Sequence, residues 1–253
     1  MSTKNETYLN QVLKDIPNGA VVTSLWLKEK GVSNRLQSTY RQNDWLKSFG
    51  NGAFSKLNDK IEMDGAIYAL QSQLDLSFHV GGISALPLKH GISHNIAFDR
   101  KIYIYGIRGE KLPKWFQDNY NEKIEVVKSE FLPADLGIEK FDNKDFETNI
   151  SSIERSVLEM LYLAPDKNSL KEIYQLMEML NVLKPKLIQE LLENCSNIKV
   201  KRLFLYIAEK LDYPWFKKLD ISKIDLGKGK RVIEKGGTLD KKYNIVIGNI
   251  EEI

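Results

Sequence analysis

The sequence predicts an α+β protein with an N-terminal winged helix-turn-helix, a mixed α/β middle section and a C-terminal helical domain closed by short strands. Three observations lead to this fold class. Three short helical patterns and a hairpin pattern occupy the first sixty residues, β-rich runs follow in the middle, and successive amphipathic helices precede a glycine-rich closing segment. We place the three parts at residues 1–60, 61–148 and 149–253.

The N-terminal part begins with an amphipathic helix that ends at the turn Pro17-Asn18-Gly19. Thr23 or Ser24 can cap a second, short helix, and Ser33 or Asn34 can cap a third helix that runs to about Gln42. The apolar residues that form the stripe of the first helix are Tyr8, Leu9, Val12, Leu13 and Ile16.

The third helix has the pattern of a recognition helix. Leu36 and Tyr40 lie four residues apart and face inward, so that Arg, Gln and Ser side chains point outward. In a helix-turn-helix the second helix enters the major groove, where Arg and Gln can read guanine and adenine edges. The residues that we expect to contact DNA are Ser33, Asn34, Arg35, Gln37, Ser38, Arg41 and Gln42.

A hairpin pattern follows, with two aromatic runs around Gly50-Asn51-Gly52. A hairpin directly after a helix-turn-helix is a wing, and Lys47, Asn51 and Lys56 are expected to touch phosphate or the minor groove. Residues 1–60 carry nine basic and five acidic groups, with no carboxylate from Val32 to Asn43. This balance favours DNA binding, and a winged helix that binds only protein is the alternative.

The middle section contains a helix pattern over residues 64–76 and β-rich runs at residues 102–107 and 124–127. An apolar run leads into Gly81-Gly82, which is also typical of the nucleotide-binding turn of a nucleotidyltransferase. That chemistry needs paired carboxylates for Mg²⁺, and no Asp-x-Asp or Asp-x-Glu follows up to residue 112. A nucleotide-binding enzyme is therefore the weaker alternative, and we interpret Gly81-Gly82 as a turn that lets a helix pack closely.

No motif for catalysis or metal binding emerges. His90 and His94 have the spacing of a helical zinc pair, but the stretch from Pro87 to His94 does not favour a stable helix, and Cys195 is distant. We therefore expect no catalytic residue, no metal and no cofactor. The polar, acid-rich stretch from residue 137 to residue 149 is interpreted as the boundary before the C-terminal domain.

Two capping boxes, Ser151–Glu154 and Ser169–Glu172, open the C-terminal helices, and four amphipathic helices with short links predict a helical bundle. A glycine-rich basic loop and a closing strand follow. Residues 199–235 carry eleven basic and five acidic groups. The residues expected to form a C-terminal basic surface, with a merely solvated rim as the alternative, are Lys199, Lys201, Arg202, Lys228, Lys230 and Arg231.

The chain shows no signal for membranes or secretion. Its apolar runs are far shorter than the roughly 20 residues of a membrane-spanning helix, and the polar N-terminus lacks a secretory pattern. Cys195 is the single cysteine, so no internal disulfide can form. These features predict a cytoplasmic protein without a membrane partner.

Several short motifs, in order along nearly the whole chain, resemble the AbiEi family. In the N-terminal part they are Ile16–Ser33, Tyr40, Trp45-Leu46 and Gly50–Phe54. In the C-terminal part they are Ser152–Arg155, Leu183–Pro185, Leu191–Cys195, Lys199–Leu205, Trp215, Asp225–Arg231 and Gly236–Tyr243.

The resemblance implies an antitoxin and transcriptional regulator of a bacterial type IV toxin–antitoxin, or abortive-infection, system. Such proteins bind inverted repeats in double-stranded DNA at their own promoter and repress it, and the protomers can be monomers in solution that pair on the DNA. The partner implied for the C-terminal domain, to which the middle section is expected to belong, is a nucleotidyltransferase toxin that is counteracted without a stable complex. The basic positions from Lys199 to Arg231 then act as DNA contacts or as part of the neutralising surface.

Overall fold

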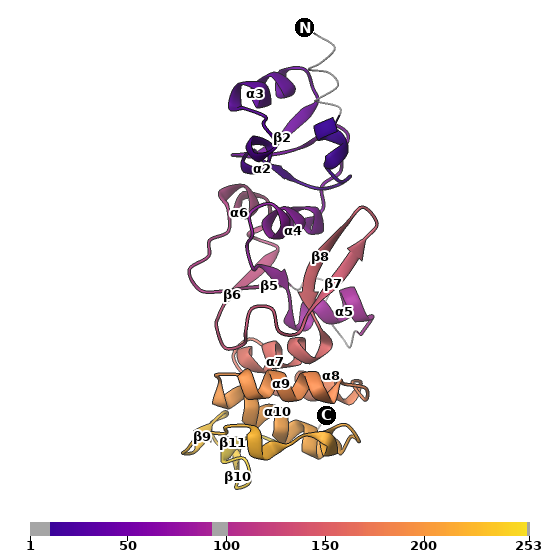
Figure 1. Cartoon of the computed structure of the whole chain (residues 1–253). Helices are drawn as coiled ribbons and strands as arrows, with labels where there is room; N and C mark the ends of the chain where they lie inside the picture. The colour runs from indigo at the N-terminus through magenta and orange to yellow at the C-terminus, as the bar shows by residue number, and fades with distance from the viewer. Residues whose placement is uncertain (1–10, 93–100, 252–253) are drawn as a thin grey trace. The chain divides into compact units, whose positions relative to one another are not determined.

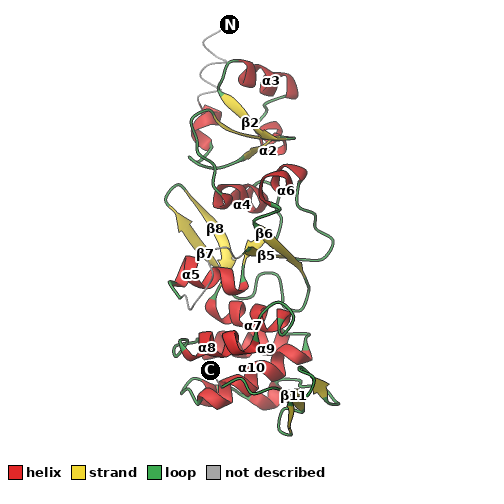
Figure 2. Ribbon diagram, turned by 180° about the vertical axis from the view of Figure 1, so that it is seen from behind, coloured by secondary structure: helices red, strands yellow, loops and turns green. Residues whose placement is uncertain are grey.

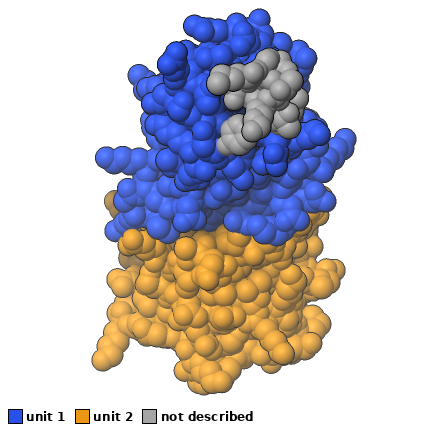
Figure 3. All heavy atoms as spheres, turned by 45° about the horizontal axis from the view of Figure 1, so that its top comes forward, with its two compact units in different colours: residues 1–79, 104–126, 140–149 blue, residues 80–103, 127–139, 150–253 orange. Residues whose placement is uncertain are grey.

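The structure is a computed structural model that describes residues 11–92 and 101–251, and it divides into two compact units. Unit 1 comprises Met1–His79, Ile104–Val126 and Lys140–Asn149, and unit 2 comprises Val80–Tyr103, Val127–Glu139 and Ile150–Ile253 (Figure 3). Each of the five points where the chain leaves one unit for the other lies inside a β-strand. The mixed helix and strand content confirms the predicted α+β class (Figure 2).

The predicted order of helices and hairpin is found at the start of unit 1. Residues 11–15 are helical, while Tyr8 and Leu9 lie outside the described residues. A three-stranded antiparallel sheet of order β1-β3-β2 completes this winged module (Figure 1). Its elements are β1 (Val22–Thr23), α2 (Ser24–Glu29), α3 (Asn34–Gln42), β2 (Leu46–Gly50) and β3 (Ala53–Lys56).

Both helices of the helix-turn-helix begin at side-chain caps. The Thr23 hydroxyl accepts a hydrogen bond from the Trp26 amide at 3.1 Å, and the Ser33 hydroxyl accepts one from the Leu36 amide at 3.4 Å. These caps satisfy amides that a helix start leaves without a partner. The module has a core of its own, formed by Val12, Ile16, Val22, Leu27, Val32, Tyr40, Leu46 and Phe54.

Two further helices of unit 1 pack close to this module. They are α4 (Met63–Ser72) and α6 (Lys114–Tyr120). A Cβ added at Gly65 of α4 would collide with the carbonyl of Gly19, so this approach requires glycine. The hydroxyl of Tyr120 on α6 donates to the carbonyl of Glu62 at 3.2 Å, which ties α6 to the start of α4.

A five-stranded sheet of order β6-β5-β4-β8-β7 contains the strands at which the units divide. Residues 137–149, interpreted from their composition as a boundary, contribute β7 and most of β8, and the chain passes between the units after Glu139 and after Asn149. Their polar composition does not indicate a linker, because strands of a sheet with a solvated face alternate polar and apolar residues. The strands are β4 (His79–Val80), β5 (Ile102–Gly106), β6 (Ile124–Lys128), β7 (Ile138–Asn143) and β8 (Phe146–Ser151).

Unit 2 is built on the four predicted C-terminal helices. They are α7 (Ile153–Leu163), α8 (Leu170–Glu178), α9 (Pro185–Asn194) and α10 (Ile198–Leu211). A small sheet of order β10-β11-β9 closes the chain, with β11 parallel to β9 and antiparallel to β10. The remaining elements are η1 (Gly82–Ser84), α5 (Ala85–His90), η2 (Phe216–Lys218), η3 (Ile221–Lys223), β9 (Arg231–Val232), β10 (Thr238–Asp240) and β11 (Ile245–Ile247).

Two local expectations in unit 2 are corrected. Ser152, not Ser151, caps α7, and the Glu154 carboxylate accepts from the Lys184 amide at 2.9 Å instead of closing a capping box. Residues Ala85–His90 form a helix that stops at Gly91, whose φ of 64° suits glycine. Packing of Leu86 in the core supplies the stability that local propensity does not indicate.

Candidate nucleic-acid interface

The exposed side of α3 is polar and basic. Asn34, Arg35, Arg41 and Gln42 are exposed and Ser38 is half-buried, which places them on one arc of the helix. Leu36 and Tyr40 pack against the module core on the other side, as predicted. No acidic side chain occurs on α3, so the arc presents donors and positive charge together, which suits both base edges and phosphates.

Gln37 does not belong to this arc, and the expectation that it points outward is wrong. Its side chain is 4% exposed. The amide nitrogen of Gln37 donates to the carbonyls of Val32 and Ser24 at 3.0 and 3.3 Å, and its oxygen accepts from the Ser24 hydroxyl at 2.7 Å. Gln37 therefore joins α2, the turn and α3. Its helical position beside Leu36 and Tyr40 is the sequence signal that indicates an edge of the buried face.

The wing is a short, anchored turn. Lys47 and Asn51 are exposed, as a contact with DNA requires. The carbonyl of Gly52 accepts from the Ser24 amide at 2.8 Å, so the turn is held at the start of α2. Gly52 has a φ of 74°, which a glycine adopts without strain.

Lys56 is half-buried and bonded to other residues of unit 1, contrary to the expectation of a wing contact. Its ammonium group donates to the carbonyl of Ile16 at 2.9 Å and to the Asn18 side chain at 2.6 Å. The Asn18 amide group in turn donates to Asp145 at 3.2 Å. Lys56 thus secures the turn after the first helical segment, because it lies at the end of β3 away from Asn51.

Three of the six cations expected on a C-terminal surface are structural. Arg202 is 2% exposed, and its guanidinium donates to the carbonyls of Leu226, Gly227, Gly229 and Asn244 at 2.7 to 3.1 Å. A planar guanidinium can satisfy several acceptors that a folded loop directs inward. Arg202 therefore fixes the glycine-rich loop to the start of β11.

Of the other two cations of α10, Lys199 is half-buried and Lys201 is buried. The Lys199 ammonium donates to the carbonyl of Tyr162 at 2.9 Å and to that of Ala164, at the C-terminal end of α7. Burial lowers the pKa of Lys199, and the charge of Asp166 opposes this in part. Lys201 is 3% exposed. The expected surface therefore does not include the α10 positions, because Lys199 is bonded to the end of α7 and Lys201 and Arg202 are buried.

Lys228, Lys230 and Arg231 remain as the exposed part of the expected basic surface. They lie on the loop that Arg202 holds and on β9. Gly227 has a φ of 62°, and its amide donates to Asp225 at 2.8 Å, so the loop has a defined turn. The three cations are therefore displayed from an ordered segment of unit 2.

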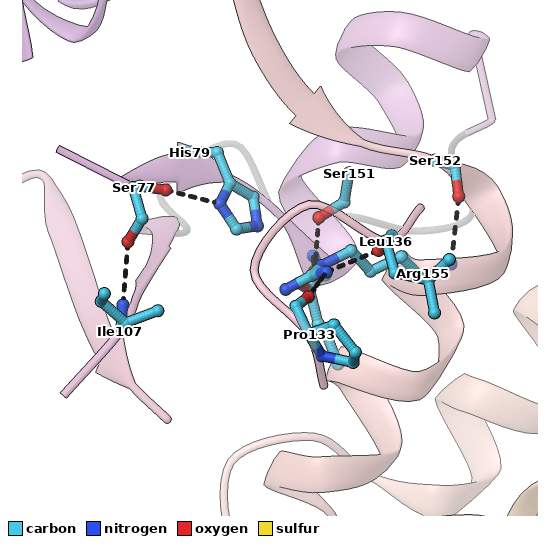
Figure 4. A network of polar contacts seen from close by, with 10 residues as sticks. Ser77, His79, Ile107, Pro133, Leu136, Ser151, Ser152 and Arg155 are labelled. Atoms are coloured by element: carbon cyan, nitrogen blue, oxygen red, sulfur yellow. Dashed lines mark hydrogen bonds and ion pairs between the residues drawn. The ribbon is translucent and has the colours of Figure 1, made fainter. Parts of the chain in front are cut away.

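The Gly81-Gly82 turn belongs to a buried polar network around Glu159 and Arg155. Figure 4 shows Ser151 and Arg155 of this network. The Gly82 amide donates to Glu159 at 2.7 Å, and the Ser151 hydroxyl donates to the same oxygen at 2.8 Å. Arg155 donates to the other oxygen of Glu159 at 2.8 Å. Its guanidinium also donates to the carbonyls of Pro133 and Leu136 at 2.7 and 2.6 Å. The Gly82 amide, which a nucleotide phosphate would need, is thus bonded to a helix of unit 2.

Metal-ligating side chains do not gather within residues 11–92 and 101–251: no three His, Cys, Asp or Glu residues lie close enough to hold an ion. His94 lies outside the described residues, so its spacing from His90 is not tested. In the same part of the chain, no helix is both long and apolar enough to span a bilayer.

The helix-turn-helix with its hairpin, and the cationic arc on its second helix, define a winged helix-turn-helix protein. The chain belongs to the AbiEi family of antitoxins and transcriptional regulators of type IV toxin–antitoxin systems. The model of the AbiEi antitoxin N-terminal domain matches residues 5–98, and that of the AbiEi antitoxin of type IV systems matches residues 99–248. The resemblance drawn from the sequence motifs is therefore confirmed.

A solved structure with a similar fold is the RV2827C protein from Mycobacterium tuberculosis. The two chains are 15% identical, with a TM-score of 0.59, and the match covers 97% of this chain and 92% of that one. At this identity the likeness concerns the fold. No curated protein matches the sequence.

Proposed function

We propose that this protein is a sequence-specific DNA-binding autorepressor and antitoxin without enzymatic activity, acting in the cytoplasm. It binds inverted repeats in the promoter of its own operon and counteracts a nucleotidyltransferase toxin encoded beside it. The observation that carries the DNA-binding part is the exposed arc of Asn34, Arg35, Ser38, Arg41 and Gln42, which has no acidic side chain. Membership of a family of transcriptional regulators and antitoxins supports the same proposal.

In this proposal α3 enters the major groove while Lys47 and Asn51 contact the backbone beside it. Arg35 and Arg41 supply donors for guanine edges or phosphates. Gln37 is not a base reader, since its amide group is occupied inside the module. Two protomers on one inverted repeat need not associate in the absence of DNA.

The test is a mobility shift with the upstream DNA of the operon against a scrambled duplex at two salt concentrations. We expect selective binding that weakens as salt rises, because phosphate contacts release counterions. The double variant Arg35→Ala/Arg41→Ala should lose selective binding and keep its fold. The matched control is Lys123→Ala/Lys144→Ala, which removes two exposed cations of unit 1 and should bind as the parent does. Equal affinity for both duplexes in the parent protein would refute operator recognition and favour a protein-binding winged helix.

The exposed cations of unit 2 are proposed to serve the antitoxin role or a second DNA contact. Substituting Lys228, Lys230 and Arg231 together by alanine separates these possibilities, because all three are exposed. Loss of toxin rescue in cells with unchanged operator binding assigns them to neutralisation, whereas weaker operator binding assigns them to DNA. Unchanged toxin rescue together with unchanged operator binding would show that the three cations are solvated surface residues with neither role.

A further inference from the structure

The wing turn contacts a helix from a distant part of the sequence. The carbonyl of Phe49 accepts from the Asn119 side chain at 3.1 Å, and the rings of Phe49 and Trp115 lie 6.0 Å apart edge to face. A Cβ placed on Gly50 would lie 2.6 Å from the Cβ of Trp115. All these residues belong to unit 1. The wing turn and the first turn of α6 are therefore direct neighbours.

Two exposed lysines lie at and just before the start of α6, the helix that packs against the wing turn. Lys114 immediately precedes Trp115, and Lys111 lies three residues earlier in the loop that enters α6. Both side chains are exposed, and in the part of the chain that the structure describes neither forms an ion pair. The loop is positioned by the Gln117 side chain, which donates to the carbonyl of Leu112 at 2.6 Å.

The one acidic residue of this loop is bonded internally. Both oxygens of Glu110 accept from the Ser77 amide at 3.1 Å, and the Ser77 hydroxyl donates to Glu110 at 2.8 Å. The hydroxyl oxygen of Ser77 also accepts from the Ile107 amide at 2.9 Å, which fixes the beginning of the loop (Figure 4). The exposed side chains of the loop therefore carry positive charge, although the middle section as a whole is acidic.

We infer that Lys111 and Lys114 form a third DNA-contacting element that binds backbone phosphates beside the wing. The inference rests on the proposed DNA binding by α3. A wing tip that approaches the backbone places neighbouring cations within reach of the adjoining phosphates, because duplex DNA carries a charge about every 1.7 Å along its axis. Since phosphate contacts do not discriminate between bases, these lysines add affinity and orientation, while α3 carries sequence selectivity.

The experiment measures binding of the full-length protein to operator and scrambled duplexes over a series of KCl concentrations. We compare four proteins in this assay. They are the parent protein, the lysine variant Lys111→Ala/Lys114→Ala, the recognition-helix variant Arg35→Ala/Arg41→Ala, and the control Lys123→Ala/Lys144→Ala. Each lost phosphate contact should reduce the slope of log affinity against log salt by about 0.9, so the lysine variant should lose up to about 1.8. Its preference for the operator should stay at the parental ratio. Circular dichroism melting verifies that each variant is folded.

The outcomes separate the two proposals. A parent protein that prefers its operator, with a lysine variant whose salt slope equals that of the control, overturns the inference and leaves operator recognition intact. A parent protein without operator preference overturns the proposed function and the inference with it. A lysine variant that loses selectivity as the α3 variant does would show base reading or a structural role, and would also overturn phosphate contact.

A substitution of opposite sign gives a second readout. Asp118 is exposed one helical turn after Lys114. Asp118→Asn should tighten binding to both duplexes at low salt, with Glu122→Gln as the control for a general change in net charge. Tightening by both variants to the same extent would indicate a long-range charge effect and would count against a local contact.

Discussion

At the scale of single residues, burial separates side chains that are available to a partner from side chains that stabilise the fold. Arg35 and Arg202 have the same chemistry, but the first is exposed on α3 and the second donates to four carbonyls inside unit 2. Gln37 and Gln42 differ in the same way, since the first is bonded within the helix-turn-helix and the second is exposed. A residue type that is able to bind DNA is therefore not enough to assign a DNA contact, because the side chain must also be exposed.

Gln37→Ala should lower the free energy of unfolding of the winged module by about 1–3 kcal/mol, because it leaves the Val32 carbonyl and the Ser24 hydroxyl without their partners. Urea unfolding followed by tryptophan fluorescence measures the change. Gln42→Ala is the control, since an exposed side chain should shift stability by less than about 0.5 kcal/mol. Equal stability of the two variants would contradict the bridging role of Gln37.

Arg202→Ala should destabilise unit 2 by about 3 kcal/mol, because several carbonyls of the glycine-rich loop lose a charged donor at once. Lys228→Ala, on the same loop but exposed, should have a small effect. Chemical denaturation midpoints compare the two. If the Lys228 variant were the less stable one, the assignment of Arg202 as the anchor of the loop would be wrong.

At the scale of elements, the wing is held both by a helix of its own module and by a helix from a distant part of the chain. The wing turn is bonded to the start of α2 on one side and to α6 on the other. Helix α6 is in turn tied to α4 through Tyr120. The wing is therefore a fixed turn, in contrast to a long mobile arm, and its position depends on residues sixty or more positions away along the chain.

Gly50→Ala should weaken DNA binding and lower stability by about 1–3 kcal/mol, because the added methyl group overlaps Trp115 and forces the wing from α6. Gly109→Ala is the control for backbone strain. Its φ of 91° is less favourable for alanine than the φ of 159° at Gly50, and its Cβ would meet nothing within 4 Å. Equal losses of stability and affinity in the two variants would remove the role of the close wing–α6 packing.

Alkaline pH should loosen the contact between α6 and α4. Burial raises the pKa of Tyr120 to about 12, with the charges of Asp64 and Glu62 acting in the same direction. A pKa raised in the folded state contributes stability that is complete below about pH 10 and is lost as pH rises toward 12, amounting to about 2–3 kcal/mol. Tyr120→Phe should show a smaller fall of unfolding free energy between pH 9 and pH 12 than the parent. An identical fall would assign the alkaline transition to other groups.

At the scale of the whole molecule, the chain passes from one unit to the other five times, so its units are not consecutive stretches of sequence. Unit 2 collects segments from three stretches of sequence, and its buried Glu159 and Arg155 take partners from all of them: Gly82, Pro133 and Leu136 as well as Ser151. A break at the boundary predicted from composition, residues 148 and 149, would separate these groups.

A fragment of residues 149–253 should therefore fail to unfold cooperatively, whereas a fragment of residues 80–253 should show a cooperative transition. The shorter fragment lacks Gly82, Pro133 and Leu136, which bond to Glu159 and Arg155. It also lacks Ile83, Leu86, Phe131 and Leu132 of the hydrophobic core. Buried charged groups that lose part of their hydrogen bonds and an open core both destabilise. Thermal melts by circular dichroism compare the two, and a cooperative melt of the shorter fragment would refute this dependence.

The sequence by itself determined the α+β class, the helix-turn-helix with its caps, the four C-terminal helices and the family. These depend on local patterns, namely apolar periodicity, capping residues, turn glycines and short motifs. Such patterns involve residues close together along the chain, so the sequence alone contains them. The exposure of Arg35 and Arg41 is predicted in the same way, because helical spacing alone places them on the face of α3 opposite to Leu36 and Tyr40.

Only the tertiary structure decided which cations are exposed, where the chain passes from one unit to the other, and which helix packs against the wing. Gln37, Lys56 and Arg202 have residue types typical of surfaces. Gln37 and Arg202 are buried and Lys56 is half-buried, because the folded chain directs carbonyls toward them. Lys111 and Lys114 lie in an acidic stretch of sequence, yet they lie at and just before the start of α6, which packs against the wing through Trp115. The physical reason is that burial and proximity depend on contacts between distant segments, whereas composition and periodicity report only on neighbours along the chain.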